Sequence, residues 1–307
     1  MILLLLLTGC ATQTRSLLQH APDLPRRIEL ASTPFFPQER YQCGPAALAM
    51  SLNAAGISTT PDELTPQVYV PQRQGSLQPE MLAAGRRHGA LSLTIAPTLG
   101  ALMTEVAAGN PVIILQNLSL PWFPLWHYAV VIGYDLDREE IVLRSGTTER
   151  AVLSLSTFEH TWARSNYWGM LALPPGRLPA MAEEDRIVNA LIALEKSADA
   201  AQARKAYAAA LQRWPNNLTL ELGYGNTAYA QGDRLAAAAA FRQAAKAHPD
   251  SAPAFNNLAA VLLELGQFEQ ARLAAEKALA IGGQWREQAL ATLQSIEAAQ
   301  RKNKNSP

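Results

Sequence analysis

The second half of this 307-residue chain repeats itself with a fixed spacing of 34 residues. The positions that keep this spacing are Pro215 and Pro249; Ala203, Ala237 and Ala271; Ala210, Ala244 and Ala278; Gly232 and Gly266; and Tyr207 and Phe241. Small residues allow two helices to approach closely, an aromatic ring fills the gap between them, and a proline ends the second helix. The pattern predicts stacked helix pairs, because one pair alone cannot bury its apolar face.

The period and its residue types resemble those of tetratricopeptide repeats. The resemblance implies three helix pairs at about residues 184–217, 218–251 and 252–285, and a last helix at about 286–301 that covers the end of the stack. We therefore expect an all-α tetratricopeptide solenoid over residues 184–301, a proline-rich linker over 174–183 and a disordered tail over 302–307. Such a solenoid is expected to bind a peptide or a protein partner.

The first half contains Cys43 in the run Cys-Gly-Pro-Ala-Ala-Leu, at the start of a segment of helix formers that closes at Gly56. A helix N-terminus stabilises an anion, so this position favours a reactive thiolate. Gln38, five residues upstream, is placed to donate an amide N–H to the oxyanion that forms when a thiolate attacks a carbonyl. The alternative is a buried, inert cysteine at a helix start.

His127 is the best candidate for a general base among the five histidines of the chain. It opens the run His-Tyr-Ala-Val-Val-Ile-Gly-Tyr-Asp, which predicts a strand buried on both faces. A histidine at the start of a core strand stands on a rigid platform with one open side. The alternative is a structural histidine at a strand end.

Together, these two segments resemble the papain-like cysteine peptidases that process the double-glycine leader peptides of bacteriocins, and in particular their stand-alone relatives outside transporters. The resemblance implies an α+β papain-like peptidase domain over residues 34–173, with Cys43 as nucleophile, His127 as base and Gln38 as oxyanion donor. The family has an Asp or Asn at the end of the next strand, where this chain has Ser145. A serine can accept a hydrogen bond from the imidazole but brings no charge. Asp135 is either a substitute for the missing carboxylate or the opening residue of a turn.

The segment 120–126, Leu-Pro-Trp-Phe-Pro-Leu-Trp, directly precedes His127. Its rings and prolines either wall a substrate groove and exclude water, or pack onto the domain as an ordinary loop.

The run Leu7-Thr8-Gly9-Cys10 resembles a bacterial lipobox, an apolar stretch followed by small residues and the acceptor cysteine. It implies a signal peptide over residues 1–9, acylation of Cys10 and a tether over 10–33, which would anchor the protein to a membrane. Ala11, and not an Asp, follows Cys10; by resemblance to known lipoprotein sorting signals, this implies the periplasmic face of the outer membrane in a bacterial cell envelope. The alternative is a chance apolar N-terminus.

Composition narrows the remaining classes of function. Lys and Arg total 26 and Asp and Glu total 26, so no basic excess predicts nucleic-acid binding. No apolar run approaches the roughly 20 residues of a membrane-spanning helix. We expect a peptidase without a metal or cofactor that acts on a peptide or protein through a Cys43 thioester. The alternatives are a catalytically impaired scaffold that has kept the fold, and an amidase or acyl-transfer enzyme on the same residues.

Overall fold

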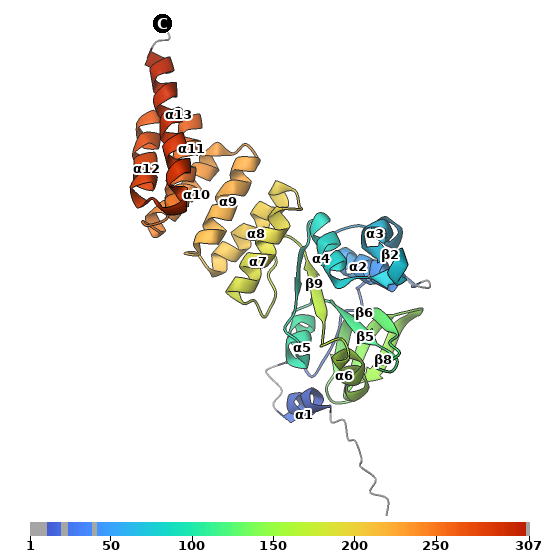
Figure 1. Cartoon of the computed structure of the whole chain (residues 1–307). Coiled ribbons are helices and arrows are strands. Elements are labelled where there is room, and N and C mark those ends of the chain that lie inside the picture. Colours follow the sequence, from blue (N-terminus) through green and yellow to red (C-terminus); the bar gives the residue numbers. More distant parts are fainter. Residues whose placement is uncertain (1–10, 20–23, 39–41, 305–307) are drawn as a thin grey trace, which may run out of the picture. The chain divides into compact units, whose positions relative to one another are not determined.

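The computed structural model describes residues 11–19, 24–38 and 42–304, and it divides into two compact units (Figure 1). The first unit contains the described residues up to Pro174 together with Leu178–Glu183, and the second contains Pro175–Arg177 and the described residues from Glu184 onward. Within the described part of the chain, no helix is both long and apolar enough to cross a bilayer.

The first unit is built on one antiparallel sheet, which has seven strands in the part of the chain that the structure describes. The strand order is β4-β9-β5-β6-β7-β8, and β1 pairs with β6. The strands are β1 (Arg27–Glu29), β4 (Leu91–Thr94), β5 (Val112–Asn117), β6 (Trp126–Asp135), β7 (Glu140–Ser145), β8 (Thr148–Ser154) and β9 (Gly169–Leu173). A small hairpin of β2 (Tyr69–Val70) and β3 (Gly75–Ser76) forms a separate sheet. This α+β architecture confirms the predicted fold class of the first half.

Helices pack on both faces of the large sheet (Figure 1). They are α1 (Thr12–Gln19), α2 (Cys43–Ala54), α3 (Pro61–Val68), α4 (Gln78–Arg87), α5 (Leu99–Ala107) and α6 (Leu155–Ala163). Successive side chains of β6 point to opposite faces, and Tyr128, Val130 and Ile132 share a buried cluster with α2. The helices α5 and α6 pack against β5 and β6 as well. The strand that carries His127 is therefore buried along most of its length, as its β-branched run predicts.

Residues 10–33 do not form the expected tether where the structure describes them. Glu159, which is buried, accepts hydrogen bonds from the backbone N–H groups of Gln13 (3.0 Å) and Thr14 (2.7 Å) at the start of α1. A carboxylate stabilises a helix N-terminus because it satisfies unpaired N–H groups and opposes the helix dipole. Further along, β1 pairs with the end of β6, with Arg27 opposite Asp135. The segment is thus part of the first unit.

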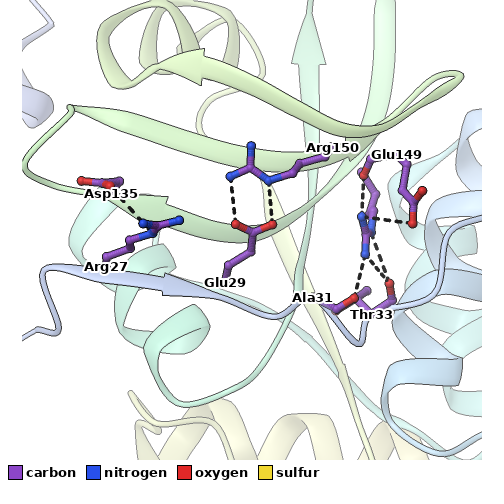
Figure 2. Close-up of polar contacts among 8 residues, drawn as sticks. Arg27, Glu29, Ala31, Thr33, Asp135, Glu149 and Arg150 are labelled. Atoms are coloured by element: carbon purple, nitrogen blue, oxygen red, sulfur yellow. Dashed lines mark hydrogen bonds and ion pairs between the residues drawn. The ribbon is translucent and has the colours of Figure 1, made fainter.

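A buried arginine holds the chain that leads from β1 to Gln38. Arg144 is 5% exposed, and its guanidinium donates to the backbone oxygens of Ala31 (3.0 Å), Thr33 (2.8 Å) and Glu149 (2.7 Å). Figure 2 shows these contacts beside the ion pairs of β1. Ser145 directly follows Arg144 in β7, so the contacts of Arg144 help to position both Ser145 and Gln38.

The second unit is a run of helix pairs. Its helices are α7 (Glu184–Glu195), α8 (Ala200–Arg213), α9 (Leu218–Ala230), α10 (Arg234–Ala247), α11 (Ala252–Glu264), α12 (Phe268–Ile281) and α13 (Arg286–Lys304). Each predicted repeat contains one pair, and α13 follows as the last helix. The tail prediction is wrong in part, because α13 continues through residues 302–304, while 305–307 lie outside the described residues.

The periodic glycines and aromatic residues have specific roles in this packing. A Cβ at Gly225 would lie 2.4 Å from Cε1 of Phe241, so only glycine lets the ring approach the backbone of α9. Gly232 and Gly266 have φ angles of +77° and +72°, a left-handed conformation that favours glycine in the turn between paired helices. The predicted close approach of paired helices around an aromatic ring is confirmed.

Candidate active site

Cys43 is the first residue of α2. The next position, Gly44, is packed so closely that it has no room for a side chain. A Cβ at Gly44 would lie 2.2 Å from Oγ of Ser76 in β3, so glycine is required for β3 to approach the start of the helix. Pro45 occupies the first turn, where its missing N–H has no helical partner to lose. The run Cys-Gly-Pro thus brings the start of α2, which carries Cys43, close to Ser76 in β3.

His127 lies near the start of β6, and its Nε2 is 2.9 Å from Oγ of Ser145 at the end of β7. The structure therefore places Ser145 where the missing carboxylate was expected. Because Nε2 interacts with Ser145, Nδ1 is the ring nitrogen of His127 that remains to accept a proton.

Asp135 is not near His127, so the alternative that Asp135 orients the histidine is wrong. The two residues stand at opposite ends of β6, eight positions apart, which corresponds to roughly 26 Å of extended strand. The carboxylate of Asp135 instead accepts hydrogen bonds from the N–H groups of Asp137 and Arg138, both at 3.0 Å. This is the turn-opening role that the sequence offered as the other reading.

Gln38 connects the strands that carry His127 and Ser145. Its Nε2 donates to the backbone oxygen of Tyr128 (3.3 Å), and its Oε1 accepts from the N–H of Gly146 (3.1 Å). The Gln38 amide group has two N–H bonds, so one remains for a substrate oxygen. The thiol of Cys43 also lies against the backbone N–H of Tyr128.

Burial makes the neutral forms of both Cys43 and His127 more favourable. Desolvation raises the pKa of the Cys43 thiol, although hydrogen bonds from the N–H groups of Tyr128 and Gly44 act in the opposite direction. Desolvation also lowers the pKa of His127. The expected low-pKa thiolate is therefore wrong for this structure, because the loss of water around the sulfur outweighs the nearby N–H groups.

These shifts predict the pH dependence of Cys43 alkylation. A raised thiol pKa means that the rate of reaction with iodoacetamide rises with pH and reaches half its maximum above the pH of roughly 8.5 typical of a free cysteine. The rate should be measured for the full chain and for the same chain unfolded in urea, with peptide mapping to separate Cys43 from Cys10. A folded-state midpoint below the unfolded one would show that Cys43 is a thiolate at neutral pH.

Cys43, His127 and Gln38 open onto one cavity of about 900 Å³. One wall is the β2–β3 hairpin, from Arg73 to Gln78, and another is formed by Leu118, Pro124, Leu125 and Trp126. The segment before His127 therefore does wall a groove, while the rings at its tip do not pack onto the domain: Trp122 is 79% exposed and Phe123 is 77% exposed.

The sequence did not identify Tyr128 and Gly146 as site residues. Both act through backbone groups, which bind Cys43 or Gln38 whatever their side chains are. The amino-acid type at such a position does not show its role. In the sequence, only their places next to His127 and Ser145 could have identified Tyr128 and Gly146.

Comparison with known proteins agrees with this geometry. Residues 30–170 match the family model described as Peptidase_C39 like family, and residues 240–273 match a tetratricopeptide repeat model. The chain thus has an N-terminal peptidase C39-like domain followed by tetratricopeptide repeats.

Solved structures resemble the two parts separately. A C39-like peptidase from Bacillus anthracis has 18% identity and a TM-score of 0.42, with 48% of this chain and 97% of that chain covered. The tetratricopeptide domain of Sgt2 from Aspergillus fumigatus has 19% identity and a TM-score of 0.37, with coverage of 41% and 84%. MamA has 17% identity and a TM-score of 0.29, with coverage of 39% and 81%. No curated protein sequence matches the chain.

Proposed function

We propose that the protein is a cysteine peptidase that cleaves a peptide bond through a thioester on Cys43. The observation that carries the proposal is that Cys43, His127 and Gln38 open onto one cavity, with Nε2 of His127 beside Ser145. The match to a peptidase C39-like family supports the class of reaction. The resemblance to leader-processing relatives makes double-glycine leader peptides the first substrates to test.

In the proposed mechanism, His127 donates its Nε2–H to Ser145 and uses Nδ1 as the base. Nδ1 takes the proton from the Cys43 thiol as Sγ attacks the scissile carbonyl carbon, and the free N–H of Gln38 binds the oxyanion. Imidazolium then gives its proton to the leaving amine, and the C–N bond breaks to leave a thioester. His127 next deprotonates a water that attacks the thioester, which releases the carboxylic acid and the thiol.

Identification of new peptide N-termini tests the function directly. The full chain and its Cys43→Ala variant are incubated separately with a peptide library from a bacterial proteome, and new amino termini are mapped. A peptidase produces termini that the variant does not. An acyl-transfer enzyme forms the same thioester and releases the same amino termini, but it passes the acyl group to an added amine, so amide products at the new C-termini would indicate that activity. No product with either chain would favour a scaffold, a role that the neutral Ser145 and the raised pKa of Cys43 make the second candidate.

In the proposed mechanism, the side chain at position 145 influences the pKa of His127. Ser145→Asp is expected to raise the pKa of His127 and to increase turnover by roughly tenfold, because a carboxylate at Nε2 stabilises imidazolium. Ser145→Ala should lower turnover by about three- to tenfold through loss of one hydrogen bond. NMR titration of His127 and steady-state turnover measure the two effects. An unchanged rate in both variants would show that Ser145 does not support the base.

We also propose that Cys10 is acylated and that the repeats recruit a substrate or a protein partner at a bacterial membrane. Cys10 and the apolar run before it lie outside the described residues, so the support is the lipobox-like run alone. The repeat match supports a role in protein binding.

Mass spectrometry of the N-terminus tests the anchor. In a bacterial host, the mature protein is expected to begin at Cys10 and to carry acyl chains, and Cys10→Ser should leave residues 1–9 uncleaved. A wild-type protein that retains residues 1–9 would contradict the proposal.

A further inference from the structure

Residues 118–126 form an exposed apolar hairpin beside the candidate active site. In the part of the first unit that the structure describes, most of the large apolar side chains that are exposed lie on it. They are Leu118 (46%), Leu120 (48%), Trp122 (79%), Phe123 (77%), Leu125 (60%) and Trp126 (49%). A patch of this kind on a soluble unit marks a surface that meets a partner or a membrane.

The apolar hairpin is ordered by its own backbone and by Asn117. The N–H of Leu118 donates to the oxygen of Leu125 (2.9 Å), and the N–H of Phe123 donates to the oxygen of Leu120 (3.1 Å). Oδ1 of Asn117 accepts from the N–H of Leu125 (2.9 Å). The N–H groups of Leu118, Phe123 and Leu125 therefore stay satisfied when the hairpin enters an apolar medium.

The tip of the apolar hairpin does not line the cavity. Leu118, Pro124, Leu125 and Trp126 line the cavity, whereas Trp122 and Phe123, the most exposed of the set, do not. A peptide bound in the cavity would therefore leave the two most exposed rings, Trp122 and Phe123, in water. A continuous apolar phase would cover both the tip and the base.

The composition of the apolar hairpin also favours a lipid surface. Residues 118–126 contain no Asp, Glu, Lys or Arg, and two of the nine are tryptophans. Tryptophan is enriched at membrane–water interfaces because its ring is apolar and its N–H is polar.

The first turn of α1 lies at the end of the sheet from which the apolar hairpin projects. Met170 of β9 lies opposite Thr94 of β4 and Ile113 of β5, so β4 and β5 run to the same end. The side chain of Gln13 accepts from the N–H of Leu99 (2.7 Å), shortly after β4 ends, and the apolar hairpin follows β5. In sequence, only Ala11 separates Cys10 from α1, so an anchor on Cys10 and the hairpin would approach a membrane from the same end of the sheet.

We propose that the apolar hairpin inserts into the interface of a lipid bilayer, with Trp122 and Phe123 at its tip, so that the candidate active site opens at the membrane surface. The insertion does not require acylation of Cys10 or catalysis by Cys43.

Vesicle partitioning of the unacylated protein without its apolar N-terminal run tests this proposal. A chain that begins at Ala11, and so has neither residues 1–9 nor Cys10, is mixed with phosphatidylcholine vesicles, and bound protein is measured by flotation at low and at high salt. Binding should resist high salt, because the hairpin carries no charge. The additional double substitution Trp122→Ser and Phe123→Ser should lower the partition coefficient by about 100-fold, about tenfold for each ring.

Matched controls distinguish vesicle binding by the apolar hairpin from binding by other exposed apolar side chains and from any effect of catalysis. Leu235→Ser with Leu273→Ser removes side chains that are 70% and 57% exposed in the repeats, and it should leave partitioning unchanged. Cys43→Ala should partition like its parent, so a failed peptidase proposal leaves this result intact. Equal melting temperatures of all variants establish that each is folded. The proposal is overturned if the chain that begins at Ala11 does not float, if the hairpin variant floats as well as its parent, or if the hairpin substitutions change only peptide cleavage.

Discussion

Replacement of Cys43 by alanine is expected to abolish peptide hydrolysis, and His127→Ala is expected to slow it by about 10²- to 10⁴-fold. The first change removes the nucleophile. The second removes the base that must take the thiol proton, and this base matters all the more because burial raises the pKa of Cys43. Turnover of a peptide identified by mapping of new amino termini provides the measurement, with melting temperatures to confirm folding.

Asp135→Asn is the matched control for this pair of substitutions. Asp135 lies on the same strand as His127 but caps a turn at the other end, so its substitution should leave turnover within about threefold of wild type. A loss as large as that of His127→Ala would show that Asp135 supports the base after all. Hydrolysis that survives Cys43→Ala would exclude the thioester mechanism.

Arg144→Met is expected to destabilise the first unit by about 1–3 kcal/mol, the cost of one unsatisfied buried acceptor. The substitution keeps an apolar stem but removes the donors for the backbone oxygens of Ala31, Thr33 and Glu149, of which the contact to Thr33 is buried. Hydrogen exchange of β6 and β7 across a urea titration measures the effect in the first unit alone.

Arg150→Met is the control, since Arg150 is a neighbouring arginine with an ion pair in place of buried carbonyl contacts (Figure 2). The Arg150 side chain is 49% exposed, and exposed pairs contribute about 0–1 kcal/mol. Similar losses for Arg144→Met and Arg150→Met would show that the carbonyl contacts of Arg144 do not hold the segment that leads to Gln38.

The features that the sequence predicts well are those encoded by local periodicity. The 34-residue spacing follows from a packing rule that each repeat obeys, so the sequence identifies Phe241 as the ring between paired helices before its contact with Gly225 is known. The run from His127 to Asp135 is buried on both faces, and its β-branched residues show this directly.

The features that the sequence does not predict depend on distant parts of the chain. The strand β1 is three residues long and has no pattern of its own, and it forms because β6 extends beyond β5. The direction of the Cys43 pKa depends on how much water the cavity walls exclude, which no local run records. The choice between Ser145 and Asp135 required the strand register, because both residues follow plausible strand ends.

Labelling of Cys43 by a peptide-based acyloxymethyl ketone, followed by intact mass and peptide mapping, tests the central claim most directly. The chain has two cysteines, so the position of an adduct is unambiguous. We expect one adduct, on Cys43, with a rate at neutral pH that falls by about 10²-fold or more in His127→Ala and approaches wild type at high pH, where the thiolate forms without a base. An adduct that forms equally fast at neutral pH in wild type and His127→Ala would contradict a Cys43–His127 catalytic pair.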